Sequence, residues 1–512
     1  MHTTIGNSMT ADVVVVGGGG SGLAGAIAAA EAGAQVVLLE KNKFLGGTTR
    51  LSIGSITATR TALQRKAGIQ DDSQGHFEDI IKFADPAIAP RDNIELRRVL
   101  VDGVTDTVAW LTSLGVSFFG PMPEPPHRKA RMHNVLPNSI SYIYHLQREA
   151  LRRGVIVKTA ARVEELLSDN GVVTGVRAII DGDIVTIAAR RGVILATGDF
   201  SNSQQLKMRF RPDLADVDAI NPSSTGDGQL MGERVGGEIV NGDLMYGQLR
   251  FVAPPGTNFM LRLPPNRALA ATMRLAIGYA PSWILRPFLL AFVTTFLAPE
   301  MAIFKQGAIL VNSRGKRFCD ETEEPHQQVA KQPGKIAYIL FDEQLAKKLS
   351  GWPHYISTAP GTAYAYLPDY RRNRKDLYHE ATDLTSLATQ LGMPSASLQS
   401  TIDEYNDGRG AHARGNRPAM SSGRYVALGP VRGWTVLGDG GLKVNDSHQV
   451  LRKDGSVIMG LYAAGSAGQG GLLLEGHGHH LGWAFTSGRR AGRYAASNQT
   501  LQETTSQLRA NG

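Results

Sequence analysis

Residues 13–40 read VVVVGGGGSGLAGAIAAAEAGAQVVLLE and set the character of the whole chain. The valine run predicts a buried strand, the glycines a tight turn, the alanine-rich stretch a helix, and VVLL a second parallel strand. Gly17, Gly19 and Gly22 satisfy the G-x-G-x-x-G spacing, which permits the turn, the approach of a pyrophosphate and close helix packing. Glu40 ends the second strand, where its carboxylate can bind ribose hydroxyls. The stretch predicts a dinucleotide-binding βαβ unit, with an ordinary glycine turn as the alternative.

Composition limits the classes of protein that this chain can belong to. Its 512 residues predict two or three domains with room for a large cofactor. A formal charge of +8 would suit nucleic acid, but Lys and Arg form no long runs and no nucleic-acid motif is present, so we expect no such partner. The single cysteine, Cys319, excludes an internal disulfide and a cysteine-based metal site. Without a secretory signal pattern, we expect a cytoplasmic protein.

The order of motifs predicts an α/β fold. Residues 162–189 alternate in polarity around DNG and DGD turns, which predicts a three-stranded β-meander inserted in a doubly wound, Rossmann-like domain. The proline-broken stretch 118–133 is interpreted as a loop without regular structure. Glycine turns of the nucleotide type stop near Asp243 and return near the end, which predicts a second, α+β capping domain. The expected divisions are 1–242 and 434–512 for the cofactor domain and 243–433 for the cap, with the ligand between them.

Residues 279–304 form the most apolar stretch of the chain. Three interpretations stay open. The stretch can supply packed helices of the cap, some of them lining an apolar pocket. It can instead form a patch that lies on a membrane surface, which would make the protein membrane-associated. A true membrane span is the third, but Pro281, Arg286, Pro287 and Pro299 interrupt it.

Several motifs, in order, resemble one flavoprotein family. They are VVGGGGSGLAGAIAAAEAG, GGTT, GVILATGDFS, TGDG, ILVNSRGKRFCDE, GGLKVN, GLYAAGS and FTSGRRAG. Together they are similar to fumarate reductases, succinate dehydrogenase flavoprotein subunits and 3-ketosteroid dehydrogenases, from about Ala11 to Ala496. The resemblance implies FAD, held extended, with its isoalloxazine at the junction with the cap. The usual context for histidine attachment is missing, so non-covalent FAD is implied.

The same resemblance implies which residues contact the cofactor. The pyrophosphate would meet Gly17, Gly19, Ser21 and Gly22, and the adenosine ribose Glu40 and Lys41. The ribityl chain and flavin would meet Gly47, Thr48, Thr49 and Ser52. The adenine side would meet Val163, Ala196, Thr197 and Gly198, with Asp227 close by. The last glycine loop adds Gly465 and Ser466, where many relatives have Glu, and the final helix adds His480 and Leu481, with its amino end toward the flavin.

The chain departs from the fumarate and succinate enzymes where these bind their substrate. The arginine of their closing N-R-L-G-G-N motif falls on Glu475 here. Their catalytic arginine falls within residues 304–306, Phe-Lys-Gln, and the histidine of H-T-x-G-G falls near Leu437. Three cationic or polar positions have thus become acidic or apolar, which disfavours a dicarboxylate substrate.

The 3-ketosteroid dehydrogenase branch is the more similar, although its catalytic tyrosines are also replaced. Its Y-x-G-x-G motif lies over residues 474–478, where both glycines are kept, and a further tyrosine position falls on His326. We expect the Gly478 amide to polarise a substrate carbonyl and His326, Glu475 or His477 to move a proton. Tyr246 and His133 are further pocket candidates. His479 and His480 are interpreted as residues that begin a helix, and no metal is expected.

These observations predict an FAD-dependent enzyme that removes or adds hydrogen across a C–C bond next to a carbonyl. An apolar, cyclic ketone is the preferred substrate class, with an unidentified electron acceptor or donor. One alternative is an ene reductase of a small unsaturated acid, for which Arg250, Arg262 or Arg286 would supply the guanidinium. The other is a flavin-binding electron-transfer protein with no substrate of its own.

Overall fold

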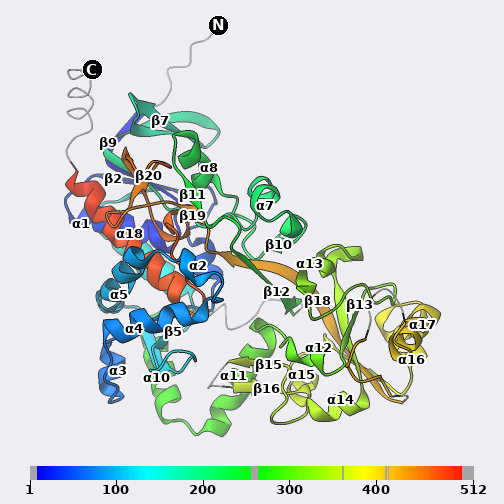
Figure 1. Cartoon of the computed structure of the whole chain (residues 1–512). Coiled ribbons are helices and arrows are strands. Elements are labelled where there is room, and N and C mark those ends of the chain that lie inside the picture. Colours follow the sequence, from blue (N-terminus) through cyan, green and yellow to red (C-terminus); the bar gives the residue numbers. More distant parts are fainter. Residues whose placement is uncertain are drawn as a thin grey trace.

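The computed structural model describes residues 8–254, 263–359, 363–409, 412, 414–421 and 423–498 (Figure 1). Its first three elements are β1 (Ser8–Val16), α1 (Gly20–Glu31) and β2 (Val36–Leu39). β-Branched valines fill β1 and alanines fill α1, in keeping with the preferences of strands and helices. The strands pair in parallel with Val13 opposite Val36. The predicted βαβ unit is therefore present.

This unit lies in an eight-stranded sheet whose main order is β20-β21-β9-β1-β2-β6. The strand β9 enters the sheet from the meander and continues without a break beside β1. The meander is predicted correctly, and it shares its last strand with the parallel sheet. The other strands of this sheet are β6 (Ile156–Lys158), β7 (Ala161–Asp169), β8 (Val172–Ile180), β9 (Asp183–Leu195), β20 (Gln449–Leu451) and β21 (Val457–Ala463).

The two ends of the described chain meet on this sheet, where α1 and α18 lie side by side (Figure 1). The contact is close because glycines line it: a Cβ on Gly492 would lie 2.2 Å from the Gly25 carbonyl oxygen. The last helix is therefore fixed against the first. The helices around this sheet are α2 (Gly47–Leu51), α4 (Ser73–Ile80), α5 (Ile94–Leu114), α6 (Ile140–Arg152), α8 (Asp227–Arg234) and α18 (His479–Ser497).

A second sheet of six strands has the main order β10-β18-β14-β13, with β12 and β17 also paired to β18. The long strand β18 runs from this sheet toward the first one (Figure 1). Its strands are β10 (Asp218–Ala219), β12 (Met245–Phe251), β13 (Ile309–Val311), β14 (Ala337–Asp342), β17 (Tyr378–Ala381) and β18 (Tyr425–Gly438). Helices near it are α12 (Ala302–Lys305), α13 (Pro325–Ala330), α14 (Glu343–Lys348), α15 (Leu367–Asn373), α16 (Leu384–Leu391) and α17 (Ser395–Asn406).

The interpretation of residues 118–133 as a loop without regular structure is wrong at both ends. A small sheet of order β3-β5-β4 includes its two ends, residues 118–122 and 132–133. Pro121 is accommodated because β4 is an edge strand, where a missing N–H breaks no ladder bond, and the register shifts between Phe119 and Met122. The strands are β3 (Ser55–Thr57), β4 (Ser117–Met122) and β5 (Met132–Leu136). The loop left between them, residues 123–131, becomes important below.

The apolar stretch forms the end of α10 (Arg267–Tyr279) and all of α11 (Ser282–Phe296). Leu290 and Val293 are buried in the core of the second sheet. Tyr279 and Phe288, in contrast, are exposed. Within the described ranges, no helix combines the length and apolar character that crossing a bilayer requires. Remaining short elements are α3 (Ala62–Lys66), α7 (Gln204–Phe210), β11 (Ile239–Val240), β15 (Ser357–Ala359), β16 (Ala363–Ala365) and β19 (Gly441–Leu442).

Candidate active site

The glycine turn between β1 and α1 is tight on one side and open on the other. A Cβ on Gly22 would lie 1.8 Å from the Gly17 carbonyl oxygen, so glycine is required there for packing. At Gly19 the nearest atom to such a Cβ is 3.9 Å away, and at Gly198 none lies within 4 Å. Both open positions follow the carboxyl ends of neighbouring parallel strands, β1 and β9. The turn thus leaves a cradle that fits a pyrophosphate at the amino end of α1.

Charged residues close to this cradle are held by backbone hydrogen bonds and by one ion pair. The buried carboxylate of Glu40 accepts hydrogen bonds from the backbone amides of Gly18 and Asn42, both at 2.8 Å. The Nζ atom of Lys41 lies 2.8 Å from the Asp227 carboxylate, although the two residues are far apart in sequence. The predicted ribose-side residues are therefore brought together at one end of the cradle.

The hydroxyl groups of Thr48 and Thr49, both on α2, lie close to the glycine turn. The Gly20 amide donates to Thr49 Oγ1 at 3.2 Å, and Asn221 donates to Thr48 Oγ1 at 2.9 Å. A Cβ on Gly465 would lie 2.6 Å from Ser21 Oγ, so the last glycine loop contacts α1 directly. The first and last glycine loops therefore converge, as an extended cofactor needs. Of the other residues expected at the flavin end, Gly47 begins α2, Ser52 follows it, and Ser466 follows Gly465. Of those expected on the adenine side, Val163 lies on β7, and Ala196 and Thr197 follow β9.

A group of polar side chains lies where β12 faces the loop of residues 474–478. Tyr246 donates to Asp439 Oδ2 at 3.1 Å and also hydrogen-bonds the Glu475 side chain. Asp439 is fully buried, which raises the pKa of its carboxyl to about 7. Burial also raises the pKa of Glu475. The second sheet therefore contributes Tyr246, through β12, to a cluster that contains the acids Asp439 and Glu475.

His477 is held by a buried glutamate from the 123–131 loop. Its Nδ1 lies 2.5 Å from Glu124 Oε1, and its backbone amide donates to the same oxygen at 2.8 Å. Thr57 donates to the His477 carbonyl at 2.6 Å, which fixes the loop from the other side. The Glu124 carboxylate raises the pKa of His477. The His477 side chain remains 46% exposed, so a fixed imidazole with a raised pKa is partly open to solvent.

Arg250 lies on β12 close enough to His477 to lower its pKa. Its Nε and Nη2 both donate to the Gln248 side-chain oxygen at 2.7 Å. No carboxylate of the described chain affects the pKa of Arg250. Burial alone lowers this pKa to about 10. Arg250 is still a cation at neutral pH, and it has charge to offer an anion. Of the other arginines considered, Arg286 is exposed on α11, and Arg262 lies outside the described residues.

The amino end of α18 offers free backbone donors beside this cluster. Gly478 is its N-cap, with φ of +85°, and a Cβ there would lie 2.6 Å from the Thr57 amide nitrogen. Within the described ranges, the Gly478 amide donates to no protein acceptor. His480 and Leu481 continue the first turn, and burial lowers the pKa of His480 to about 4. Positive partial charge at this helix end can stabilise a developing anion.

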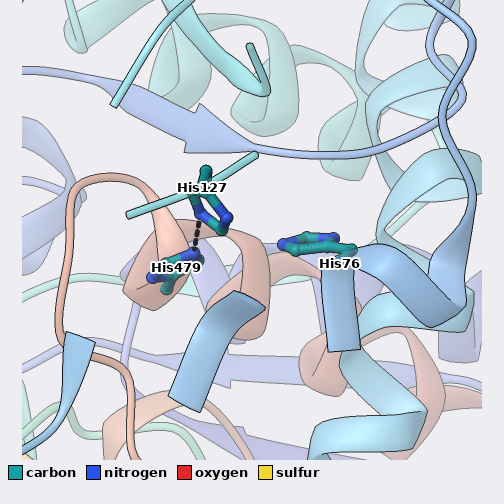
Figure 2. A group of neighbouring side chains, drawn as sticks. All are labelled: His76, His127 and His479. Carbon is teal, nitrogen blue, oxygen red and sulfur yellow. Dashed lines mark hydrogen bonds between the residues drawn. The ribbon is translucent and has the colours of Figure 1, made fainter. Parts of the chain in front are cut away.

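Three buried histidines lie behind the same helix end (Figure 2). Their nitrogens come within 4.8 Å of one another, which would permit three ligands to a metal ion. The hydrogen bonds favour another arrangement. Arg131 donates to His127 Nδ1 at 3.1 Å, so His127 Nε2 carries the proton and donates to His479 Nε2 at 3.1 Å; His479 Nδ1 then donates to the Glu475 carbonyl. His127 is thus a donor toward His479, and a metal ligand would need its lone pair there. His76 completes the group.

The other predicted site histidines lie elsewhere. His326, on α13, is buried against β12 at Gly247, and the charges that act on it belong to Glu324, Arg211 and Asp213. No hydrogen bond of the described chain joins His326 to Glu475 or His477. His133 is buried in β5, where its Nε2 lies 2.8 Å from Thr61 Oγ1. A catalytic role for His326 therefore stays a prediction without support from its contacts.

The sequence interpretation missed Glu124, Asp439, His76 and His127. Glu124 precedes a proline pair, and nothing in that pattern marks a carboxylate as buried. Asp439 directly precedes the GGLKVN motif, but nothing in the sequence marks its carboxylate as buried. The histidine cluster joins α4, a loop and α18, which only the tertiary structure brings together.

Comparisons with known proteins agree with this geometry. The FAD binding domain family matches residues 12–257 and 279–473. A fumarate reductase (cytochrome) of Shewanella frigidimarina is 29% identical over 514 residues, covering 95% of this chain and 77% of that protein. The solved open conformation of a flavocytochrome c3 fumarate reductase superposes with a TM-score of 0.71 at 25% identity, covering 96% of this chain and 79% of the other. The 3-ketosteroid-Δ4-(5α)-dehydrogenase of Rhodococcus jostii shares the fold, with a TM-score of 0.60, 24% identity and coverages of 97% and 99%.

Fold, cradle and polar cluster define a flavin-dependent oxidoreductase. The chain belongs to the FAD binding domain family that includes the fumarate reductases, and its fold is also that of ketosteroid dehydrogenases. The expected family, fold class, enzyme class and FAD cofactor are confirmed. The reaction is of the kind these enzymes share, at a carbon–carbon double bond. The interpretation as a flavin carrier without its own substrate is therefore not retained.

Proposed function

We propose that the protein adds or removes hydrogen across a C=C bond conjugated to a carbonyl, where β12 faces residues 474–478. FAD, when bound, supplies hydride chemistry at N5. His477 would give or take the proton at the carbon next to the carbonyl, because its Nδ1 is fixed by Glu124 while the ring is half-exposed. This fixed, half-exposed imidazole close to Arg250, which has no carboxylate partner in the described chain, is the observation that carries the proposal.

The carbonyl oxygen of the substrate would bind at the amino end of α18. The Gly478 amide has no protein acceptor among the described residues, and the helix end favours negative charge. Charge that develops on the oxygen during the reaction would be stabilised there. Glu475, hydrogen-bonded to Tyr246, would border this position and orient the substrate.

A small unsaturated acid is the substrate class that the charges support best. Arg250 is a cation without a carboxylate partner in the described chain, on the strand face that presents Tyr246 to Glu475. A substrate carboxylate would complete its hydrogen bonds as a bidentate pair. A single available guanidinium suits one carboxylate better than two. The Shewanella frigidimarina relative is a fumarate reductase, and fumarate is itself an unsaturated acid.

An apolar, cyclic ketone is the second candidate. It is supported by Glu475 and by residues 304–306, Phe-Lys-Gln, which stand where the fumarate enzymes are expected to have arginines. The Gly478 amide could polarise a ketone without any cation. The aromatic residues of the apolar stretch give this candidate less support than the sequence implied, because Tyr279 and Phe288 face solvent.

We also propose that FAD is bound without a covalent bond, and that an electron carrier, not identified, exchanges electrons with it. Acid precipitation should release the flavin into the supernatant. The substrate test is an anaerobic screen of the holoenzyme. Reduced enzyme is mixed with unsaturated acids and enones, oxidised enzyme with saturated acids and cyclic ketones, and the flavin absorbance is followed. Reoxidation by acids alone supports the first candidate, bleaching by ketones the second, and no change with any compound contradicts both.

A further inference from the structure

The helices α10 and α11 form a face of the molecule that the proposed chemistry does not use. They lie at the opposite end of the molecule from the β7–β9 meander (Figure 1). Leu290 and Val293 of α11 are buried, and this side contacts β12, β15 and β16. The end of α10 and the first half of α11 are different: Tyr279 is 84% exposed, Trp283 74% and Phe288 66%. Large apolar side chains at this exposure, gathered on neighbouring residues, indicate a surface that meets something apolar.

The charges around this face have a single sign. No Asp or Glu occurs between Asp243 and Glu300, whereas Arg267, Arg274 and Arg286 all lie on the two helices. Arg274 and Arg286 are exposed beside the aromatic residues. An apolar surface with only positive charge complements an anionic one. A bilayer with acidic headgroups offers both properties, apolar chains below and negative charge above.

The lengths of α10 and α11 limit how this face can contact a bilayer. The family match omits residues 258–278, which include nearly all of α10. α10 has 13 residues and α11 has 15, with Pro287 inside it. At about 1.5 Å per residue, neither reaches across a hydrocarbon core of about 30 Å. Trp and Tyr prefer the headgroup level, where Trp283 and Tyr279 would lie.

We propose that the face formed by Tyr279, Trp283, Phe288, Arg274 and Arg286 docks on an anionic lipid bilayer, with α10 and α11 lying in its interface. The aromatic side chains insert at the level of the headgroups, and the two arginines contact lipid phosphates. This contact would hold the enzyme at a membrane surface without any segment crossing it. The inference does not depend on the identity of the substrate.

The test is sedimentation of the full-length holoenzyme with vesicles. We expect it to sediment with vesicles of phosphatidylcholine and phosphatidylglycerol mixed equally, less with phosphatidylcholine alone, and less as salt rises. The double variant Trp283→Ser/Phe288→Ser should lose about tenfold or more in partitioning to both. The double variant Arg274→Gln/Arg286→Gln should lose mainly the preference for phosphatidylglycerol. Retained flavin absorbance checks that each variant is folded.

Ile184→Ser is the matched control, because Ile184 is 62% exposed on β9 and far from this face. It should bind vesicles as the wild type does. The proposal is overturned if the wild type does not sediment with anionic vesicles, or if Ile184→Ser weakens binding as much as the aromatic variant. Light scattering tests the alternative that this face binds a second copy of the chain, because it measures the mass of the protein in solution. If Trp283→Ser/Phe288→Ser converts a dimer to a monomer without reducing vesicle binding, the face is a dimer contact and the proposal is wrong.

Discussion

The Nδ1 atom of His477 lies 2.5 Å from Oε1 of Glu124, and the His477 backbone amide donates to the same oxygen at 2.8 Å. One buried carboxylate oxygen therefore sets both the path of the loop and the protonation of the ring. The carboxylate comes from the loop between β4 and β5, whereas the histidine precedes α18. Two distant segments of the chain thus meet at the residue that we propose to move the proton.

Replacing Glu124 by Gln should change the pH dependence of the reaction. Glu124 raises the pKa of His477, and reduction of a double bond needs His477 protonated. The rate of reduction should be full below this pKa and fall as the pH rises through it. In Glu124→Gln the pKa of His477 drops, so the fall should begin at lower pH. Anaerobic stopped-flow reoxidation across pH values measures it.

Glu149→Gln is the control for this experiment, since Glu149 pairs with Arg152 on the surface of α6. Its profile should match the wild type. An unchanged profile in Glu124→Gln would show that the ion pair does not govern the reaction.

Replacing Arg250 by Gln should lower kcat/KM for unsaturated acids and leave kcat/KM for ketones unchanged. A charge-assisted pair is worth roughly 1.5–3 kcal/mol, so kcat/KM for acids should fall roughly 10- to 100-fold. Arg432→Gln is the matched control, because Arg432 lies opposite Arg250 in the strand register and pairs instead with Asp218. Equal losses for acids and ketones in Arg250→Gln would argue for a structural role.

Two glycine variants should separate packing from cofactor binding. Gly22→Ala puts a methyl 1.8 Å from the Gly17 carbonyl oxygen, so it should cost about 3 kcal/mol or more and yield little folded protein. At Gly19, φ is −78° and the nearest atom is 3.9 Å away, so Gly19→Ala should fold normally. It should still bind FAD about tenfold or more weakly, because the methyl occupies the cradle. Thermal melting with and without FAD measures both effects, and tight FAD binding by Gly19→Ala would contradict the cradle.

The histidine cluster should need no metal. His127 accepts from Arg131 and donates to His479, so hydrogen bonds already occupy the facing nitrogens of two of the three histidines, whereas the ring nitrogens of His76 have no partner among the described residues. A chelator should leave the melting temperature unchanged, and elemental analysis should find no stoichiometric transition metal. His127→Leu leaves His479 Nε2 without its partner and removes one of the two acceptors of Arg131 Nη1, so it should destabilise the fold by about 1–3 kcal/mol in urea unfolding. A bound metal that disappears in His76→Ala would contradict this arrangement.

Local pattern predicted much of the fold because each βαβ signal is contained in neighbouring residues. The run from Val13 to Glu40 can be interpreted without any distant contact, and the DNG and DGD sequences mark the turns of the meander. Residues 117–122 were misjudged because only the tertiary structure makes β4 an edge strand, where Pro121 costs no ladder bond.

The candidate site was less accessible to sequence analysis. Glu475, His477 and Gly478 lie within four residues of one motif, so the sequence identifies them together. Their partners Glu124 and Asp439 come from other segments, and their burial, which sets the pKa values, is a property of the folded chain. Arg250 was named only among three arginines, because sequence cannot say which one lacks a carboxylate.

The most direct test of the proposed chemistry is anaerobic reoxidation of the reduced flavin in the wild type and in His477→Gln. With a small unsaturated acid, the wild type should recover its oxidised flavin absorbance, and His477→Gln, with FAD still bound, should be slower by roughly a hundredfold or more. Equal rates in both proteins, or no reoxidation of the wild type by any unsaturated acid or enone, would contradict the account.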